Sequence, residues 1–155
     1  MSIPLLDLQR IATNFAPHSI LLVTPPDHPL AASLADRPEI LRVDATNLLE
    51  GKTDMPPRRR LALVADTLEH LSASRGETLI ALLRDRLAET LYCLADPEQW
   101  PAPRMLALGL QPFDVYPRDG GAALYHFDLY DYKRTPDWLN PCNWANPEQW
   151  NKHRW

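Results

Sequence analysis

Three polar residues of the types used in catalysis follow one apolar run near the middle of the chain. The stretch 61–71 reads LALVADTLEHL, so Asp66, Glu69 and His70 come directly after LALVA. Carboxylates and an imidazole suit general acid–base catalysis or the binding of a cation. These three residues are therefore the candidate catalytic residues.

A structural interpretation of the same three residues is favoured over the catalytic one. Asp66 is expected to cap a helix by accepting the amide of Leu68 or Glu69. Glu69 then places a negative charge at the helix start, where it is favourable. His70 is expected to be partly buried and hydrogen-bonded.

Two other predicted strands also end in acidic or histidine residues. Asp27 and His28 follow the first strand, and Asp44 follows the second. Asp44 comes 21 residues after Val23, the spacing of an acidic residue that holds a ribose in nucleotide-binding folds. Asp44 is therefore the candidate cofactor-binding residue, although a helix cap or turn is the favoured interpretation of this position.

The elements that position these residues alternate between strand and helix. Apolar runs predict strands at 19–23, 40–43, 61–65 and 90–94, and a hairpin of 113–116 with 122–129 around Asp119-Gly120-Gly121. Helices are predicted at 3–15, at 28–35 with Asp27 as its cap, after a capping box at 74–77, and at 103–108. This order predicts an α/β fold with a mainly parallel sheet, helices on both faces and an antiparallel C-terminal hairpin.

This order, with LALVADTLEHL at its centre, resembles the class I S-adenosylmethionine-dependent methyltransferase family over residues 5–130. The resemblance implies a Rossmann-like fold in which ligands bind at the carboxyl ends of the strands. The whole chain also resembles a group of bacterial proteins that join this core to a Trp-rich tail, and that likeness implies no activity.

The chain departs from the methyltransferase family after its first strand. The family has a Gly-rich cofactor loop there, whereas this chain reads Thr24-Pro25-Pro26-Asp27-His28-Pro29. Proline fixes φ and has no N–H to offer a ligand. The segment between the first and third strands is also short, which suggests that a strand and a helix of the full fold are missing. S-adenosylmethionine is the one cofactor that the resemblance implies, and the sequence predicts that it is not used.

Composition and charge limit the kinds of protein that this chain is expected to be. The 155 residues have a net charge of −4 and two cysteines, so we expect a cytoplasmic protein without a disulfide framework, membrane segment or signal peptide. Three arginines at 58–60 do not make nucleic-acid binding the favoured interpretation. No metal site is predicted, because the ligand-type residues lack any tight pair spacing. Those residues are Cys93, Cys142, His126 and His153.

The last 25 residues, 131–155, form a predicted extension to the 1–130 domain. Its indoles recur at intervals of five or six residues, and Asn146–Trp150 (NPEQW) nearly repeats Asp96–Trp100 (DPEQW). Such aromatic content argues against disorder. We expect the extension to pack on its own domain, while a partner-binding surface and a plug for the cofactor space are the alternatives. The candidate partner-binding residues are Trp138, Trp144, Trp150 and Trp155.

Three hypotheses of function follow. The leading one is a methyltransferase-like protein without S-adenosylmethionine-dependent catalysis, acting as a binding or interaction module. The first alternative is a methyltransferase for a small molecule, with Asp44 on the cofactor. The second is an acid–base or cation-dependent enzyme that uses Asp66 and His70.

Overall fold

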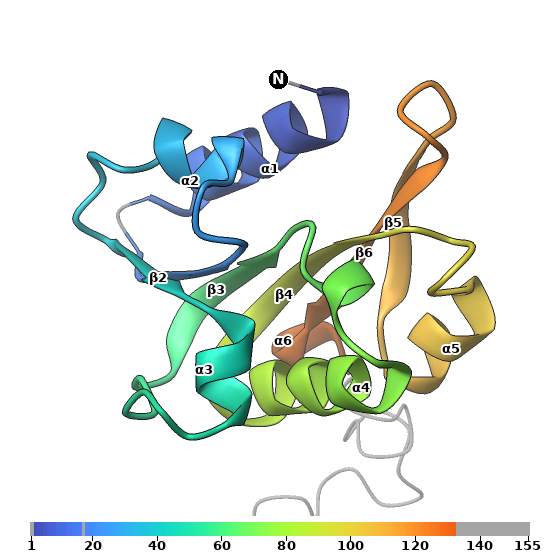
Figure 1. The fold of residues 1–155 in the computed structure, drawn as a ribbon. Helices are drawn as coiled ribbons and strands as arrows, with labels where there is room; N and C mark the ends of the chain where they lie inside the picture. The colour runs from blue at the N-terminus through green and yellow to red at the C-terminus, as the bar shows by residue number, and fades with distance from the viewer. Residues whose placement is uncertain (1, 17, 133–155) are drawn as a thin grey trace, which may run out of the picture.

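A six-stranded sheet with helices on both faces forms the core of the protein (Figure 1). The computed structural model describes residues 2–16 and 18–132. The strands are β1 (Ile20–Val23), β2 (Ile40–Val43), β3 (Arg59–Val64), β4 (Ala88–Ala95), β5 (Gln111–Tyr116) and β6 (Ala122–Asp128). The α-helices are α1 (Ile3–Phe15), α2 (Pro29–Ser33), α3 (Ala45–Leu49), α4 (Ala73–Leu82), α5 (Ala102–Ala107) and α6 (Leu129–Tyr132). A 3₁₀ turn, η1 (Leu68–His70), and a π-helical turn, η2 (Leu83–Leu87), complete the described elements.

The strand order is β2-β1-β3-β4-β6-β5, and it confirms the predicted α/β class with a mainly parallel sheet. The first four strands are parallel, whereas β6 is antiparallel to both β4 and β5. Val23, Val43 and Val64 end β1, β2 and β3 in one register. The residues that follow these three strands therefore gather at one edge of the sheet, which we call the carboxyl edge.

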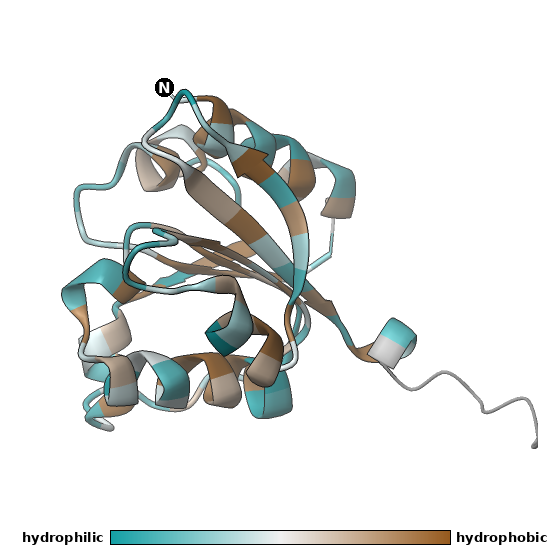
Figure 2. Ribbon diagram, turned by 90° about the vertical axis from the view of Figure 1, so that its right-hand side faces the viewer, coloured by the Kyte–Doolittle hydropathy of each residue, from teal (hydrophilic) through white to brown (hydrophobic). Residues whose placement is uncertain are grey.

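Apolar side chains fill the space on both sides of the sheet. On one face, α1 and α2 cover β1 and β3 through Leu8, Leu30 and Leu63. On the other face, α3, α4 and α5 cover a second cluster that includes Trp100. Figure 2 shows hydrophobic residues concentrated along the strands and the helix sides that meet them. Strands buried on both faces explain why the sequence carries continuous apolar runs.

Several predicted helix starts are displaced by one or two residues. His28, not Asp27, caps α2, since its ring accepts the Leu30 N–H. Ser72, not Ser74, caps α4 by accepting the Arg75 N–H. In both places two residues at most two positions apart could serve as the cap.

The C-terminal hairpin follows the prediction closely. Gly120 and Gly121 have φ of +73° and +76°, a conformation that side-chain-bearing residues rarely adopt. The predicted domain boundary near residue 130 falls within α6. The predicted packing of the extension and its four tryptophans lie outside the described residues. Within the part that is described, no helix is long and apolar enough to cross a membrane.

Candidate functional site

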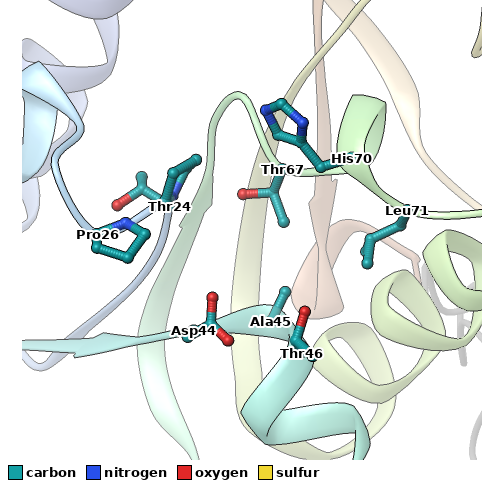
Figure 3. A pocket seen from close by; sticks show the side chains of 9 residues that line it. Thr24, Pro26, Asp44, Ala45, Thr46, Thr67, His70 and Leu71 are labelled. Atoms are coloured by element: carbon teal, nitrogen blue, oxygen red, sulfur yellow. The ribbon is translucent and has the colours of Figure 1, made fainter.

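A cavity of about 160 Å³ opens at the carboxyl edge of β1, β2 and β3. Side chains from three segments converge on it: the loop after β1, the start of α3 and the turn after β3 (Figure 3). Its lining residues are Thr24, Pro25, Pro26, Asp44, Ala45, Thr46, Thr67, His70 and Leu71. A second hollow of about 300 Å³ adjoins it and is lined by Thr24, Pro26, Arg42, Val43 and Asp44. Ligands of open α/β sheets bind at this edge.

Asp44 lies on the boundary between the two hollows, and its side chain points into the main cavity (Figure 3). Its Oδ2 accepts the backbone N–H of Asn47 at 3.1 Å, which makes Asp44 the N-cap of α3. The capping role predicted from the sequence is thus confirmed. Because capping uses one carboxylate oxygen, the other is available to a ligand.

The loop after β1 offers a ligand few hydrogen-bond donors. Pro25 and Pro26 have no N–H, and the His28 N–H is directed back to the Pro25 carbonyl at 3.3 Å. The guanidinium of Arg42 donates to the Pro26 carbonyl and so joins the loop to β2. The Thr24 hydroxyl is buried without a hydrogen-bond partner beside both hollows. Thr24 is thus the polar group of this loop that is free to bind a ligand.

A buried histidine connects the loop after β1 to the turn after β3. His28 has a side chain only 4% exposed, and its Nδ1 accepts the Leu30 N–H at 3.2 Å. An Nδ1 that accepts a hydrogen bond carries no proton, so the ring proton is on Nε2. Nε2 donates to Oδ2 of Asp66 at 2.8 Å. We call this contact the His28–Asp66 bridge.

The bridge corrects the predicted role of Asp66 as a helix cap. Asp66 has φ of +47°, the only positive φ at a described non-glycine residue, and its carboxylate is directed to His28. The following 3₁₀ turn begins after Thr67 with no side-chain cap. The Thr67 hydroxyl instead bonds the carbonyls of Val23 and Ala65 and ties the turn to β1.

The other two catalytic candidates lie in different surroundings. Glu69 Oε1 accepts the Asp96 N–H at 2.9 Å, while its Oε2 is buried without a partner. His70 lines the cavity and is exposed, which corrects the expectation that it is partly buried and hydrogen-bonded. No hydrogen bond or ion pair joins any two of Asp66, Glu69 and His70, so the structure gives the acid–base hypothesis no assembled site.

The remaining sequence candidates also have defined places. Burial, with the nearby charge of Glu69, raises the pKa of the Cys93 thiol far above its ordinary value and makes it a poor nucleophile or ligand. Among described residues no three His, Cys, Asp or Glu side chains are grouped as metal ligands would be. Cys142 and His153 lie outside those residues.

The three arginines at 58–60 all bind acceptor groups of the protein itself. Arg58 donates to the carbonyls of Arg84 and Asp85, and Arg59 to that of Glu39. Arg60 pairs with Glu89 at 2.6 Å. These contacts hold the start of β3 in place.

Sequence reasoning placed Asp44 and His70 at this edge but missed Thr24 and Thr67. Thr24 directly follows β1 and Thr67 lies three residues after β3, and this nearness to recognised strand ends was the available signal. The pairing of His28 with Asp66 had no local signal, because 38 residues separate the two.

Comparisons with known proteins agree with this architecture. The model of one family, described as a family of unknown function, matches residues 4–155. No curated protein matches the chain.

Solved structures of methyltransferases share the fold. The N-methyltransferase NodS from Bradyrhizobium japonicum WM9, in complex with S-adenosyl-L-homocysteine, aligns with a TM-score of 0.58 and 16% identity, covering 80% of this chain and 84% of that one. The 1,6-didemethyltoxoflavin-N1-methyltransferase of Burkholderia thailandensis aligns with a TM-score of 0.50 and 16% identity, covering 80% and 75%. At this identity the likeness establishes the fold, and the resemblance expected from the sequence is confirmed at that level.

Proposed function

Since the chain belongs to DUF6231, a family of unknown function, and has a methyltransferase-like fold, we propose that it is a methyltransferase-like protein without S-adenosylmethionine-dependent catalysis. In this proposal it acts as a binding or interaction module. The observation that carries the proposal is the His28–Asp66 bridge, which lies between the loop after β1 and the turn after β3.

The bridge engages the acidic residue that the methyltransferase resemblance places at the site. Asp66 follows β3, and its Oδ2 is 2.8 Å from the Nε2 of a buried histidine. A group that displaced His28 from Asp66 would leave Nε2 of a side chain only 4% exposed without a partner. One oxygen of Asp66 therefore holds two loops together.

The loop after β1 supports the same conclusion. A cofactor held by a Gly-rich loop depends on close backbone approach and on free N–H groups. Pro25 and Pro26 supply neither, and Arg42 holds the Pro26 carbonyl. Prolines in place of a Gly-rich loop make this segment rigid, and a rigid segment without N–H donors is poorly suited to bind an extended cofactor.

The size of the cavity, taken without the adjoining hollow of about 300 Å³, also favours a compact ligand. Its volume of about 160 Å³ lies below the roughly 300 Å³ at which pockets for small molecules begin. Thr24 Oγ1 and the Asp44 oxygen that does not cap α3 are polar groups available there. These groups would suit a small hydroxylated or cationic ligand.

Titration calorimetry of the full chain with S-adenosylmethionine and S-adenosylhomocysteine tests the proposal. We expect no saturable heat at micromolar concentrations of either compound. Micromolar binding that Asp44→Ala abolishes would overturn the proposal. Asp54→Ala is the matched control, because Asp54 is an exposed carboxylate outside both hollows.

Methylation of a small molecule is the second candidate, and the position of Asp44 favours it. The carboxylate ends β2 with one free oxygen and faces two adjoining hollows. In that function Asp44 would bind cofactor hydroxyl groups, and His70, which lines the cavity, would lie near the acceptor. The same titration separates the two candidates.

A further inference from the structure

Three rings form a cluster on the face of the sheet that α1 and α2 partly cover. Tyr92 of β4 lies 5.1 Å from Phe113 of β5 and 5.7 Å from His126 of β6, between ring centroids. Phe113 and His126 are 5.6 Å apart. We call these three residues the ring triad. Tyr92 also packs at the margin of the core beneath α1, which fixes the face on which the triad lies.

The ring triad is only partly covered by the rest of the described structure. Phe113 remains 51% exposed, although two other rings support it. The Nδ1 of His126 is buried without a hydrogen-bond partner. Supported aromatic rings that remain exposed are typical of surfaces that bind another segment.

The chain leaves the described structure beyond the end of β6, the strand that carries His126, and Leu129 there packs against the cluster on the other face of the sheet. His126 pairs with Tyr92, and Asp128 pairs with Thr90 one step further along the same strands. The short helix α6 follows at once and ends at Tyr132. Segment 133–155 therefore begins seven residues after His126, beyond the amino-terminal end of β4. The cavity at Asp44 lies at the opposite edge of the sheet.

Charge also favours segment 133–155 as the occupant. The segment has Lys133, Arg134, Lys152 and Arg154 against Asp137 and Glu148, so it contributes +2 to a chain of net charge −4. Asp114 and Asp128 pair with Leu124 and Thr90 on the ring-triad face, and both are at least partly exposed. A basic, tryptophan-bearing segment thus complements a ring cluster flanked by carboxylates.

A motif within the described part shows how such a segment can insert an indole. In Asp96–Trp100 (DPEQW), Asp96 Oδ1 accepts the Glu98 N–H at 3.0 Å, and its carbonyl accepts the Trp100 N–H at 2.7 Å. This turn directs Trp100 into the core, where it is 2% exposed. Asn146–Trp150 (NPEQW) has the same residue order, and asparagine offers the same side-chain acceptor.

We propose that the ring triad is the docking surface for segment 133–155 of the same chain, with Trp150 as an anchoring indole. The segment covers Phe113 and leaves the cavity at Asp44 open. This inference is independent of the proposed function, since it concerns the opposite end of the sheet.

Limited proteolysis of the full chain tests the docking. Trypsin cleaves after Lys152 and Arg154, and mass spectrometry gives the rate at which each bond is cut. We expect Phe113→Ser and Trp150→Ala each to accelerate these cuts at least about tenfold, the effect of losing one anchoring contact. Tryptophan emission should shift to longer wavelength in Phe113→Ser as the indoles become hydrated.

Val115→Ser is the matched control for Phe113→Ser. Val115 lies two residues away on β5, is 55% exposed and pairs with Ala123 on the other face of the sheet. Its cleavage rates should equal those of the unmodified chain. Equal rates in all variants would overturn the proposal, as would protection that disappears on dilution, which would identify a second copy as the occupant. Trp150→Ala keeps the test decisive if Phe113→Ser fails to fold, since it leaves every described residue unchanged.

Discussion

At the scale of single residues, Asp66 combines an uncommon backbone conformation with a hydrogen bond to a buried histidine. Its φ of +47° is in the left-handed region, where a Cβ is unfavourable by about 1 kcal/mol. The hydrogen bond to His28 is the interaction that the conformation makes available. The bridge therefore offsets the backbone strain that it requires.

Three substitutions at Asp66 separate the bridge from the strain. Asp66→Asn keeps an acceptor for Nε2–H and tolerates positive φ, so we expect its stability to change by less than about 0.5 kcal/mol. Asp66→Ala leaves His28 Nε2 unpaired and keeps the strain, with a loss of about 2 kcal/mol. Asp66→Gly loses the bridge but relieves the strain, with a loss of about 1 kcal/mol. Urea unfolding at pH 7 gives these values.

Equal losses for Ala and Gly would show that the backbone at Asp66 is not strained. An Ala variant as stable as the unmodified chain would show that the bridge contributes nothing to folding.

The candidate site was predictable from sequence only as far as local pattern reaches. Asp44 follows an apolar run, so its place could be read directly, and a helix cap was one of the two structural roles that the sequence suggested for it. His28 and Asp66 were each recognised at a strand end, but their pairing depends on the close approach of β1 and β3. The absence of a cap at η1 follows from that pairing, and so it too had no local signal.

At the scale of elements, α4 packs closely on Trp100 at Gly76. A Cβ added to Gly76 would lie 2.3 Å from Cζ2 of Trp100, well inside contact distance. The indole cannot move easily, because it is buried and its Nε1–H donates to the Leu68 carbonyl at 3.4 Å. Gly76 is thus the position that allows α4 to pack on Trp100.

Gly76→Ala tests which of two opposing effects is larger. Alanine favours a helix by about 1 kcal/mol over glycine, whereas overpacking a core costs roughly 1–3 kcal/mol. Because the overlap with Trp100 is severe, we expect a net loss of at least about 1 kcal/mol in urea unfolding. Ser74→Ala, at an exposed position of the same helix, should change stability by less than about 0.5 kcal/mol. A Gly76→Ala variant more stable than the native chain would show that the indole relocates.

The presence of each strand and helix was easier to predict from the sequence than the residues at which it begins and ends. Each central strand is buried on both faces, so its apolar run was plain in the sequence. The helix starts were less certain because Ser72 and Ser74, or Asp27 and His28, offer equivalent caps within two residues. The π-helical turn at Leu83–Leu87 continues the buried face of α4 through Leu83 and Leu87, so the apolar face is kept while the helix type changes.

At the scale of the whole molecule, buried tyrosines make stability sensitive to alkaline pH. Burial is the main cause that raises the pKa of Tyr92, Tyr116 and Tyr125, and the Asp7 carboxylate adds to it at Tyr116 through a hydrogen bond of 3.0 Å. The folded chain therefore keeps these protons at a pH where the unfolded chain releases them. The resulting stabilisation is present below about pH 10, the ordinary value for tyrosine, and is lost as pH rises above it.

Tyr116→Phe should flatten this alkaline decline. One tyrosine contributes a slope of at most about 1.4 kcal/mol per pH unit between its unfolded and folded pKa. We expect the free energy of unfolding, measured in urea from pH 8 to 11, to fall less steeply above pH 10 in the variant. Parallel curves for the two proteins would contradict this account of Tyr116. The variant should also be less stable at pH 8 by about 1 kcal/mol, since it lacks the bond to Asp7.

The position of β2 at the sheet margin links the cavity to the motions of the sheet. Among the described strands β2 has a single hydrogen-bonded neighbour, β1, and its last residue leads directly into Asp44. A strand held on one side frays more readily than one held on both. Whatever binds at Asp44 favours the closed strand over the frayed one by mass action. Occupancy of the site and integrity of the sheet margin are therefore thermodynamically linked, and a ligand at Asp44 stabilises the end of β2.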